Sequence, residues 1–531
     1  MDPLTPIIIG ISDLKNPSLA TTPTPPEPAS LIHSAILAAI NDASPTSPAQ
    51  LQAAIDSIDV VKTWTWPYAD LPGLLAGMLG LKEGDLKRKF YSEHGGDKPG
   101  RLVDEAARRL SRGEGKVMVC CGGETLASLS ACAAAGKFPP PGWTEPSEDI
   151  TKVFTPTGID LGDDIRAIHG IGTPIQVYPL YENAFRAHRS QSMADNHRES
   201  ARLYAEFAAI AEKNPHAWFS GKRETEETIG KVGGRNRMIC SPYPLLMNAF
   251  NTVNLASAVI LTTTSHAETL GIPRSKWIYP LTGTGTSSPS SFLTRSTFST
   301  SPALTLTLRA ALSTSATPVS ALSHLDIYSC FPIVPKLAAT ALNLPITDSP
   351  LPLTLLGGLT SFGGAGNNYG MHGITECVRR LRAERAGDAE DKRGLVLCNG
   401  GVLTYMYAVV LGTQPREGGG YTEGNPLDGV VAEEEETKIV GMEGCEGDAV
   451  VETYTVEFAK SGKPLRGYIV GRLSGDGRRF LANHGDENTL LLMASGNEEI
   501  VGKKGSVRRD GEREGRNLFV FEEGRGTRAR I

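Results

Sequence analysis

The chain has 531 residues, of which 40% are hydrophobic and 21% are charged. A chain of this length exceeds what one hydrophobic core can organise, so about three domains are expected. The formal net charge of −6 gives no electrostatic reason to expect nucleic acid or an anionic membrane surface as the main partner. No apolar run reaches the length that spans a bilayer.

Neither end of the sequence carries a recognisable targeting signal. Residues Met1 to Asn16 lack the basic stretch of a secretory signal, and the final Arg-Ala-Arg-Ile matches no retention or peroxisomal signal. The eight cysteines show no C-x-x-C spacing, so a metal site is not expected and reduced thiols are the default. We therefore expect a cytoplasmic protein, with the peroxisome as an alternative that no clear signal supports.

Strands and helices alternate along the first part of the chain. The elements expected there are the strand Ile7–Ile11, the helix Leu31–Ala43, the strand Ile55–Lys62, the helix Leu102–Leu110 and the strand Lys116–Cys121. This order is typical of a sheet covered by helices on both faces. From about residue 135 to 240 the alternation is interrupted, although Asp195–Asn214 predicts an amphipathic helix, and we interpret this stretch as an insertion.

The alternation resumes after the insertion. Leu245–Leu270 is expected to be helical and then strand-like, and the third set ends in the strand pair Gly394–Leu397 and Val402–Val410. Between them, Thr286–Thr317 is rich in Ser and Thr and is expected to cross the surface with limited order.

Composition changes after residue 413. Gln414–Thr437 is Gly-rich and acidic and is interpreted as a linker. Short strands with turn signals follow, and their spacing predicts a small β-barrel over Val450–Phe458, Arg466–Leu473, Phe480–Asn483 and Asn517–Phe521. The basic stretch Lys503–Arg516 contains no aromatic residue to stack on a base, so nucleic acid is an unlikely partner.

Three segments resemble the thiolase superfamily, in particular the sterol-carrier-protein thiolases and the thiolase-like proteins. They are Pro174–Ile210 with Asn214-Pro215-His216-Ala217-Trp218, Ser241–Asn248 running on to Gly271-Ile272-Pro273, and Tyr328-Ser329-Cys330-Phe331-Pro332 followed by Gly357-Gly358-Leu359-Thr360. The resemblance covers roughly residues 5–415 and implies an α/β protein with a five-layered αβαβα thiolase fold. Its N-terminal half would span 1–270, including the insertion at about 135–240, and its C-terminal half 271–413. An OB-like barrel at 438–531 would follow the linker at 414–437.

The resemblance locates the site by its altered signatures. A thiolase holds its nucleophilic cysteine in a Cys-x-x-Gly motif at a helix N-terminus, where the helix dipole stabilises a thiolate. Here no cysteine precedes Cys120, and Asp97-Lys98-Pro99-Gly100 aligns with that motif, which puts Asp97 in the place of the nucleophile. The alternative is that Asp97 is an ordinary helix N-cap.

The family's His-Asp-Cys-Phe signature lines up with Tyr328-Ser329-Cys330-Phe331. Cys398-Asn399-Gly400-Gly401 resembles the Cys-x-Gly loop of ordinary thiolases. Cys330 matches an acid/base cysteine, and Tyr328 stands where the family has a histidine. Neither Cys330 nor Cys398 begins a predicted helix, so a large thiolate fraction does not follow from the sequence. The alternatives are that Cys330 is a packing residue and that Cys398 ends a strand before a glycine turn.

The Gly-His-Pro signature aligns with Gly363-Gly364-Ala365, so its histidine is lost. Gly363, Gly364, Asn367 and Asn368 are expected to contact a CoA thioester, and Tyr369 and His372 to take part in catalysis. The alternatives are that Tyr369 only lines the wall of the site and that His372 is an ordinary helix residue whose hydrogen bonds are made within the fold. No metal or dinucleotide pattern appears, so no bound cofactor is expected beside the CoA thioester substrate.

The resemblance leaves three functions open. The first is acyl transfer on CoA thioesters through Cys330 or Cys398, like that of an acetyl-CoA C-acetyltransferase. The second is retro-aldol cleavage of a 3-hydroxyacyl-CoA with Tyr328 and Tyr369 as acid and base. The third is a non-catalytic acyl-CoA-binding or scaffold protein. Because thiolases pair through a sheet edge, a homodimer is also implied.

Overall fold

The computed structural model describes residues 2–17, 24–150, 164–385, 391–418, 420–432 and 437–522. The strands of its first sheet lie in the order β1 (Pro6–Lys15), β7 (Asn254–Thr263), β4 (Val117–Thr125), β2 (Ile55–Val60) and β3 (Arg88–Tyr91). β7 runs antiparallel to both of its neighbours, and β2 is parallel to β4 and β3. Nearly every residue of β1, β4 and β7 is buried, as expected for strands covered on both faces.

The second sheet repeats the first four strands of this arrangement. Its order is β8 (Tyr279–Ser287), β11 (Tyr405–Gly412), β10 (Arg393–Gly400) and β9 (Leu322–Ile327). Like β7, β11 is antiparallel to its neighbours, whereas β10 and β9 are parallel. The order β1-β7-β4-β2 therefore recurs as β8-β11-β10-β9, and the two sheets belong to two halves of the same topology.

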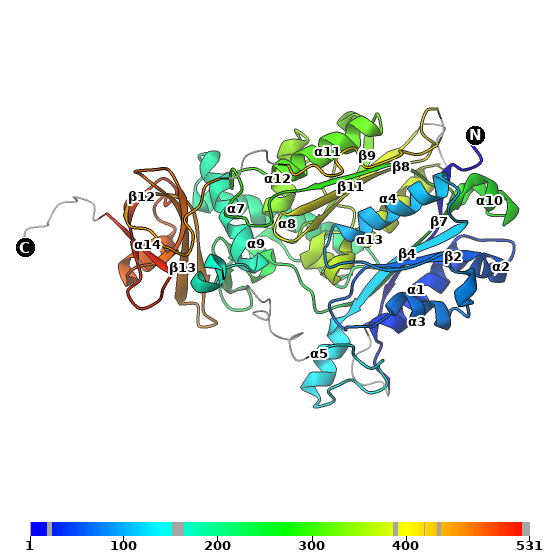
Figure 1. Cartoon of the computed structure of the whole chain (residues 1–531), viewed down its shortest axis with the longest axis horizontal. Helices are drawn as coiled ribbons and strands as arrows, with labels where there is room; N and C mark the ends of the chain where they lie inside the picture. The colour runs from blue at the N-terminus through cyan, green and yellow to red at the C-terminus, as the bar shows by residue number, and fades with distance from the viewer. Residues whose placement is uncertain are drawn as a thin grey trace, which may run out of the picture.

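Two helices lie between the sheets. α4 (Lys98–Ser111) and α13 (Tyr369–Arg385) each contact strands of both sheets. α1 (Pro28–Asp42) covers the outer face of the first sheet, and α11 (Pro302–Thr314) and α12 (Ile333–Ala341) cover the second (Figure 1). These layers form the αβαβα arrangement expected from the sequence.

The packing of α1 on β1 illustrates how an outer layer forms. The buried side chains of α1 include Leu31, Ile32 and Ala35, which recur at helical spacing and face the sheet. Gly10 of β1 permits the close approach, because a Cβ at this position would overlap the carbonyl oxygen of Ala39.

The insertion lies between β4 and β7. Its elements are α5 (Leu126–Ala134), α6 (Ile165–His169), α7 (Pro174–His188), α8 (Met193–Lys213), α9 (Glu226–Gly230), β5 (Met238–Cys240) and β6 (Tyr243–Pro244). In the second half, a short turn over 401–404 joins the equivalent strands β10 and β11. The insertion is therefore a large difference between two otherwise similar halves.

A fully buried ion pair fastens the insertion to the second half. Lys336 on α12 donates to Glu182 on α7 at 2.6 Å, and to Asn196 and Ser200 on α8 at 2.8 Å each. Glu182 also accepts a hydrogen bond from the Tyr243 hydroxyl at 2.5 Å. Both charges are thus paired and hydrogen-bonded, which is the condition under which proteins tolerate a buried charge.

The C-terminal domain is a closed five-stranded barrel. Its elements are β12 (Gly447–Phe458), β13 (Pro464–Leu473), β14 (Arg479–His484), α14 (Glu487–Ser495), β15 (Lys504–Arg509) and β16 (Asn517–Phe521). β12 pairs with both β13 and β15, and β14 pairs in parallel with β16. This closed order is that of an OB-fold. The sequence analysis did not predict α14 or β15.

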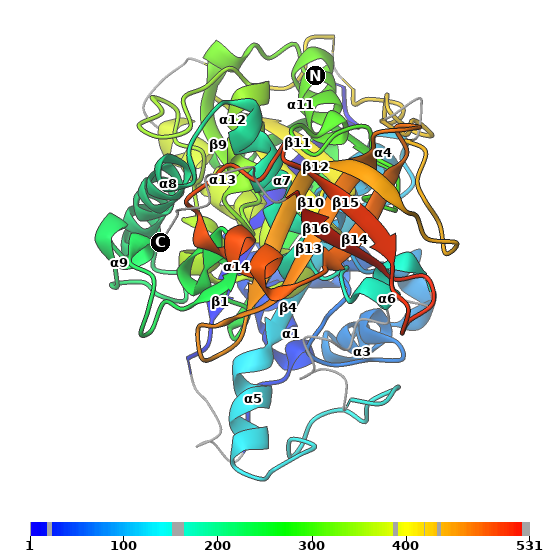
Figure 2. The same ribbon diagram turned by 90° about the vertical axis from the view of Figure 1, so that its left-hand side faces the viewer.

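The barrel is joined to the insertion by backbone and side-chain contacts, and Figure 2 shows α6 of the insertion beside the barrel. β5 pairs with β12, so the barrel sheet continues into the β5–β6 hairpin. Beside β14, the carbonyl oxygen of His169 accepts a hydrogen bond from Asn483 at 3.2 Å, and that of Gly170 accepts one from the Tyr468 hydroxyl at 3.0 Å. The insertion therefore contacts the β13–β14 face, on which OB-folds bind oligonucleotides.

The connection from the second half to the barrel follows the edge of β8. Asn425 exchanges hydrogen bonds with Gly285 in both directions, at 3.1 and 2.7 Å, and the Ala432 N–H donates to the Ser287 carbonyl at 2.8 Å. The described part of the expected linker is thus fixed against a strand. Residues 419 and 433–436 of that linker, 151–163 of the insertion and 523–531 of the barrel domain lie outside the described residues.

Two expectations about secondary structure are wrong. The Ser/Thr-rich stretch 286–317 contains α11, because Leu304, Leu308 and Ala311 form an apolar face that is buried against the second sheet. The helix expected at the start of 245–270 is a single 3₁₀ turn, Leu245–Met247, and a helix, α10 (Thr264–Thr269), follows β7 instead.

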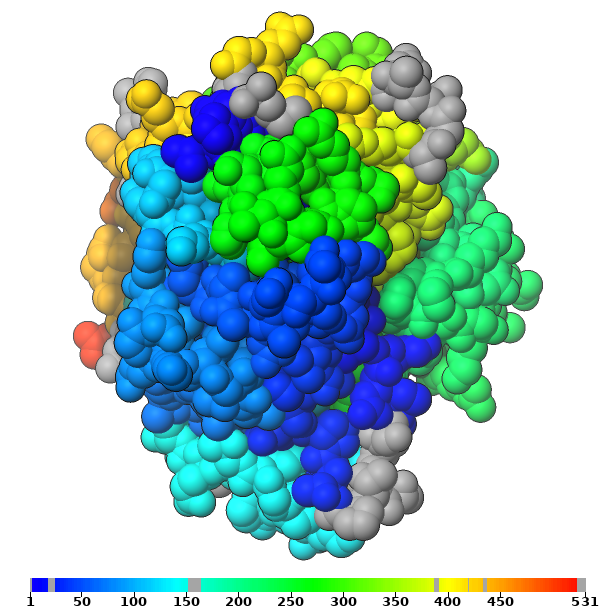
Figure 3. All heavy atoms as spheres, turned by 90° about the vertical axis from the view of Figure 1, so that its right-hand side faces the viewer, coloured from blue at the N-terminus to red at the C-terminus, as the bar shows by residue number. Residues whose placement is uncertain are grey.

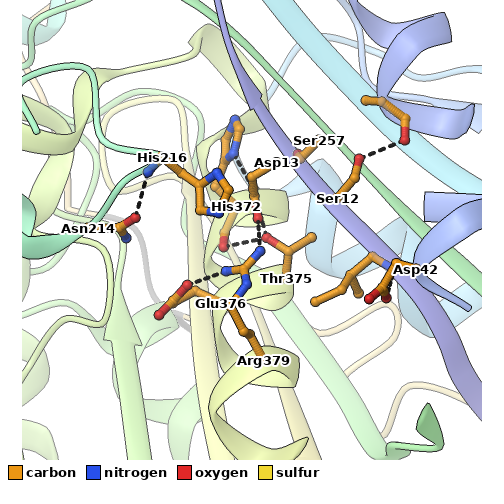
Figure 4. A network of polar contacts seen from close by, with 12 residues as sticks. Ser12, Asp13, Asp42, Asn214, His216, Ser257, His372, Thr375, Glu376 and Arg379 are labelled. Atoms are coloured by element: carbon orange, nitrogen blue, oxygen red, sulfur yellow. Dashed lines mark hydrogen bonds and ion pairs between the residues drawn. The ribbon is translucent and has the colours of Figure 1, made fainter. Parts of the chain in front are cut away.

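A buried carboxylate fixes α13 to β1 (Figure 4). Asp13 on β1 accepts hydrogen bonds from His372 Nδ1 at 2.6 Å, from Thr375 at 2.9 Å and from Arg379 at 2.7 Å. Burial by itself raises the pKa of Asp13, but its hydrogen bond to His372 and the charges of His372, Arg379 and His216 outweigh this effect and hold the pKa below its usual value. Three side chains of one helix therefore converge on one strand position.

The end of the molecule opposite the barrel is formed largely by the first half (Figure 3). There the segment after α10 lies beside the end of α1, where the Thr46 N–H donates to the Leu270 carbonyl at 3.3 Å. Across the described part of the chain, no helix combines the length and apolar character needed to cross a bilayer.

Replacing Lys336 by Met tests the buried ion pair. The variant leaves the Glu182 carboxylate buried without its cation, so we expect the free energy of unfolding to fall by about 3–5 kcal/mol. Urea denaturation followed by circular dichroism measures this change. Lys213→Met, at the exposed end of α8, is the matched control and is expected to change the free energy by no more than about 0.5 kcal/mol. Equal effects of the two substitutions would contradict the assignment.

Candidate active site

Three segments meet where the N-terminus of α4 approaches the carboxyl ends of β9 and β10. Gly96, just before α4, lies against the Asn399 carbonyl oxygen and the Tyr328 ring, because a Cβ at this position would crowd both. Gly400, at the end of β10, lies in the same way against the Asp97 carboxylate. The structure therefore brings residues 96–97, 328 and 399–400 together at one place in the fold.

Asp97 occupies the N-cap position of α4, but its side chain makes no capping hydrogen bond. Its Oδ2 lies 3.4 Å from Lys98 Nζ, whereas its buried Oδ1 has no hydrogen-bond partner among the residues that the structure describes. Burial raises the pKa of Asp97, and the charge of Lys98 only partly opposes this shift. A buried carboxylate oxygen in this state is typical of a site that binds a ligand or transfers a proton.

Tyr328 and Tyr369 form an edge-to-face pair with their ring centroids 5.3 Å apart. Tyr328 is close enough to Asp97 to feel its charge, whereas the Tyr369 hydroxyl lies near Thr354 and Ser329. Burial raises the pKa of both phenols well above the ordinary value, so both are neutral hydrogen-bond donors near pH 7. The Tyr328 ring therefore lies against Gly96, the residue before Asp97, and Tyr369 supports that ring.

Cys330 lies three residues before the first residue of α12, near the N–H of Phe331 and the hydroxyl of Tyr178. Asn399 joins this group, since its amide donates to Tyr178 Oη at 2.9 Å and lies 3.9 Å from Cys330 Sγ. Burial raises the pKa of Cys330 to about 12, although Tyr178 and the nearby N–H groups lower it. A thiol with this pKa is almost entirely protonated at pH 7.

Cys398 packs behind these residues, between α4 and α13. Gly100 of α4 and Gly370 of α13 both lie against its Sγ, and a Cβ on Gly370 would overlap the sulfur. Burial raises the pKa of Cys398 above the ordinary value for a thiol. These contacts describe a packing residue, and a catalytic role for Cys398 stays a prediction.

His372 lies one turn beyond Tyr369 on α13 and is bonded to Asp13 (Figure 4). The ring of Phe362 lies 5.2 Å from that of His372 and 5.9 Å from that of Tyr369. Phe362 therefore contacts both rings, and the hydrogen bond of His372 fixes α13 rather than joining it to Asp97.

The two glycines expected to bind the thioester have packing contacts. Gly363 lies against Val253 and Trp218, and the Gly364 N–H donates to the Phe250 carbonyl at 2.8 Å. Their contact with a ligand stays a prediction.

Asn367 and Asn368 anchor the turn before α13. Asn367 accepts a hydrogen bond from the Gly95 N–H at 3.1 Å and donates to the Lys62 carbonyl at 2.9 Å. Asn368 donates to the Gly122 carbonyl at 3.0 Å. Asn367 thus ties this turn to the start of α4, and ligand binding by either side chain remains untested.

Tyr178 and Asn399 are site residues that the sequence analysis did not nominate. Both stand inside segments that carry the family resemblance. Their polar side chains in those segments were the signal that could have identified them. The hydrogen bond between them joins positions 221 residues apart, a separation that local patterns do not reveal.

A family model, thiolase-like protein type 1 additional C-terminal domain, matches residues 426–512. A search of curated proteins found no match to the chain. The matched residues include most of the barrel described above.

The chain is also similar to several solved structures. One is a monomeric SCP2-thiolase-like protein type 1 from Mycobacterium smegmatis, with 27% identity, a TM-score of 0.80, and coverage of 98% of this chain and 100% of that protein. The Ltp2-ChsH2(DUF35) aldolase follows with 21% identity, a TM-score of 0.56, and coverage of 77% and 98%. Human mitochondrial 3-ketoacyl-CoA thiolase shows 13% identity, a TM-score of 0.54, and coverage of 77% and 99%. The last two likenesses concern the fold alone.

These similarities confirm the fold and the family expected from the sequence. Two halves of one topology enclose α4 and α13, and the matched barrel follows them. The chain has the thiolase fold, it is similar to an SCP2-thiolase-like protein, and its barrel matches the type 1 additional C-terminal domain of thiolase-like proteins.

Proposed function

We propose that the chain binds a CoA thioester where α4 meets β9 and β10, and that it cleaves the C2–C3 bond of a 3-hydroxyacyl-CoA by acid–base chemistry. One observation carries this proposal: the Asp97 carboxylate is buried at the N-cap of α4 without a capping hydrogen bond. The family resemblance aligns this position with the nucleophilic cysteine of a thiolase. A carboxylate accepts a proton, and the neutral Tyr328 beside it donates a hydrogen bond.

In the proposed reaction Asp97 takes the proton of the 3-hydroxyl group while the C3–O bond becomes a carbonyl and the C2–C3 bond breaks. The electron pair of that bond moves to C2 and is delocalised onto the thioester oxygen. There the Tyr328 hydroxyl donates a hydrogen bond. A solvent proton then adds to C2, and Asp97 releases its proton to solvent. The products are a shortened acyl-CoA and an aldehyde or ketone, and the balance requires no resident cofactor.

Acyl transfer is the second candidate, and a backbone N–H beside the thiol of Cys330 favours it. A nearby N–H group stabilises a thiolate, and the Phe331 N–H lies near Cys330 Sγ. Because the pKa of Cys330 is nevertheless about 12, we rank this acetyltransferase-like function below the lyase. The Ltp2-ChsH2(DUF35) aldolase supports the lyase only as an example of such chemistry on a similar fold.

The homodimer implied by the resemblance remains untested. β3, at one edge of the first sheet, has four residues, and two of them are Arg88 and Lys89. A short, charged edge opposes pairing between subunits. This edge, together with the monomeric state of the similar M. smegmatis protein, favours a monomer.

Asp97→Asn tests the base. We expect kcat for cleavage across a panel of 3-hydroxyacyl-CoA substrates to fall by roughly 10²–10⁴-fold, because the amide cannot accept the hydroxyl proton. Chromatography of the shortened acyl-CoA measures the rate. In the wild type, we expect activity to rise with pH as Asp97 loses its proton. Because the pKa of Asp97 is raised, this rise occurs at a higher pH than it would for an exposed aspartate. Asp85→Asn, on the surface, is the control, and an unchanged profile in Asp97→Asn would refute the assignment.

Tyr328→Phe tests the donor. Loss of one hydrogen bond to the developing enolate is expected to lower kcat by about 10²–10³-fold with little change in KM. Tyr68→Phe removes a buried hydroxyl near α1 and is expected to leave kcat unchanged. If Tyr328→Phe retains wild-type turnover, Tyr328 is not the donor.

Intact-mass spectrometry after incubation with acetyl-CoA or acetoacetyl-CoA separates the lyase from acyl transfer. We expect no acyl adduct on the wild type, because the Cys330 thiol is protonated, and we expect Cys330→Ala to keep lyase activity. An adduct that disappears in Cys330→Ala would instead establish acyl transfer. Binding of CoA esters without turnover of any substrate would favour the non-catalytic alternative.

A further inference from the structure

Two aromatic side chains lie at the surface beside the candidate site. His94, three residues before Asp97, is exposed, and its ring stacks on Trp64 with centroids 5.4 Å apart and 13° between the planes. Trp64 is itself 41% exposed. The buried carboxylate of Glu124 fixes the Trp64 backbone, because it accepts a hydrogen bond from the Trp64 N–H at 2.7 Å. The stacked pair is therefore a fixed feature of the surface close to Asp97.

Asn367 determines which nitrogen of His94 carries hydrogen. The Gly95 N–H can only donate and the Lys62 carbonyl can only accept, so their hydrogen bonds to Asn367 fix the orientation of its amide. The amide nitrogen of Asn367 lies 3.3 Å from His94 Nδ1. Nδ1 is therefore an acceptor, and the hydrogen of the neutral imidazole is on Nε2.

The surroundings of His94 also favour the neutral ring. Partial burial lowers the pKa of His94; the charge of Asp97 opposes this shift, and those of Lys62 and Lys98 reinforce it. A neutral imidazole with hydrogen on Nε2 donates at that nitrogen and does not accept. A ligand group that meets Nε2 must therefore offer an oxygen acceptor.

We infer that His94 orients the ligand by donating from Nε2 to a carbonyl oxygen of the pantetheine arm of a CoA thioester, on a ring held by Trp64 and Asn367. This inference rests on the proposed function for the identity of the ligand. Amide carbonyls of the pantetheine arm match a single neutral donor at the surface, while Asp97 and Tyr328 are buried. His94 is thus a positioning residue and takes no proton in the reaction.

Calorimetric titration of the full chain with acetyl-CoA tests the donor position. His94→Gln places an N–H group near the position of Nε2, His94→Asn places one near Nδ1, and His94→Phe keeps the ring without a donor. We expect His94→Gln to retain the wild-type Kd, and His94→Asn and His94→Phe to weaken binding by about 3–10-fold, the effect of one hydrogen bond. His188→Asn, exposed at the end of α7, is the control and should leave Kd unchanged.

A ¹⁵N NMR measurement of the His94 ring gives a readout that requires no ligand. We expect hydrogen on Nε2 in the wild type and a mixture of tautomers in Asn367→Leu. Hydrogen on Nδ1 in the wild type, or wild-type Kd in His94→Phe, would overturn the inference while leaving the proposed function intact. If the wild type binds no CoA ester at all, the proposed function fails and the role of His94 fails with it. The two failures are distinguished by wild-type binding.

Discussion

The candidate site depends on the close packing of two helix starts between the sheets. Near their first turns, α4 and α13 are separated by little more than the Cys398 sulfur, which lies against Gly100 and Gly370. A side chain at Gly370 would push the sulfur or the helix away, and in a close-packed interior such a shift is transmitted to neighbouring groups. Asp13 holds α13 from the side of β1 through three side chains of that helix. Two sets of contacts therefore fix the relative positions of the two helix starts. The Cys398 sulfur packs between α4 and α13, and the Asp13 carboxylate binds α13 to β1.

The same packing decides which chemistry the site favours. Burial disfavours the charged form of every acid, so it raises the pKa of Cys330, Tyr328 and Asp97 alike. A thiol begins near 8.5 and a phenol near 10, so an upward shift takes both out of the physiological range. A carboxyl begins near 3.9, and an upward shift brings it toward that range. The buried carboxyl of Asp97 is therefore better suited than the buried thiol of Cys330 to accept a proton near neutral pH.

Apolar periodicity was sufficient to predict β1, α1, β2, α4 and β4, because each buries a regular set of side chains in the two-layer contacts of the first half. It failed for α11, where Ser and Thr residues masked a helical apolar face, and for α14 and β15 in the barrel. The resemblance brought Asp97, Tyr328 and Cys330 into view as motif positions, but it did not reveal which of them contact one another. The Tyr178–Asn399 and His94–Asn367 contacts join positions 221 and 273 residues apart. Such contacts are set by tertiary packing, which single-sequence patterns do not contain.

The barrel contributes to the site through α7. Thr453 on β12 donates to the Leu180 carbonyl at 2.6 Å, and Asn183 donates to the Tyr454 carbonyl at 2.8 Å. On a helix, Asn183 is turned by about 140° from Tyr178, so one side of α7 meets the barrel while another carries the tyrosine that contacts Asn399. Removal of the barrel would release the support of this helix and, with it, the position of the Tyr178 hydroxyl. Because α6 lies against β14 at the same interface, the barrel is better understood as part of the wall that positions the site than as an independent binding module.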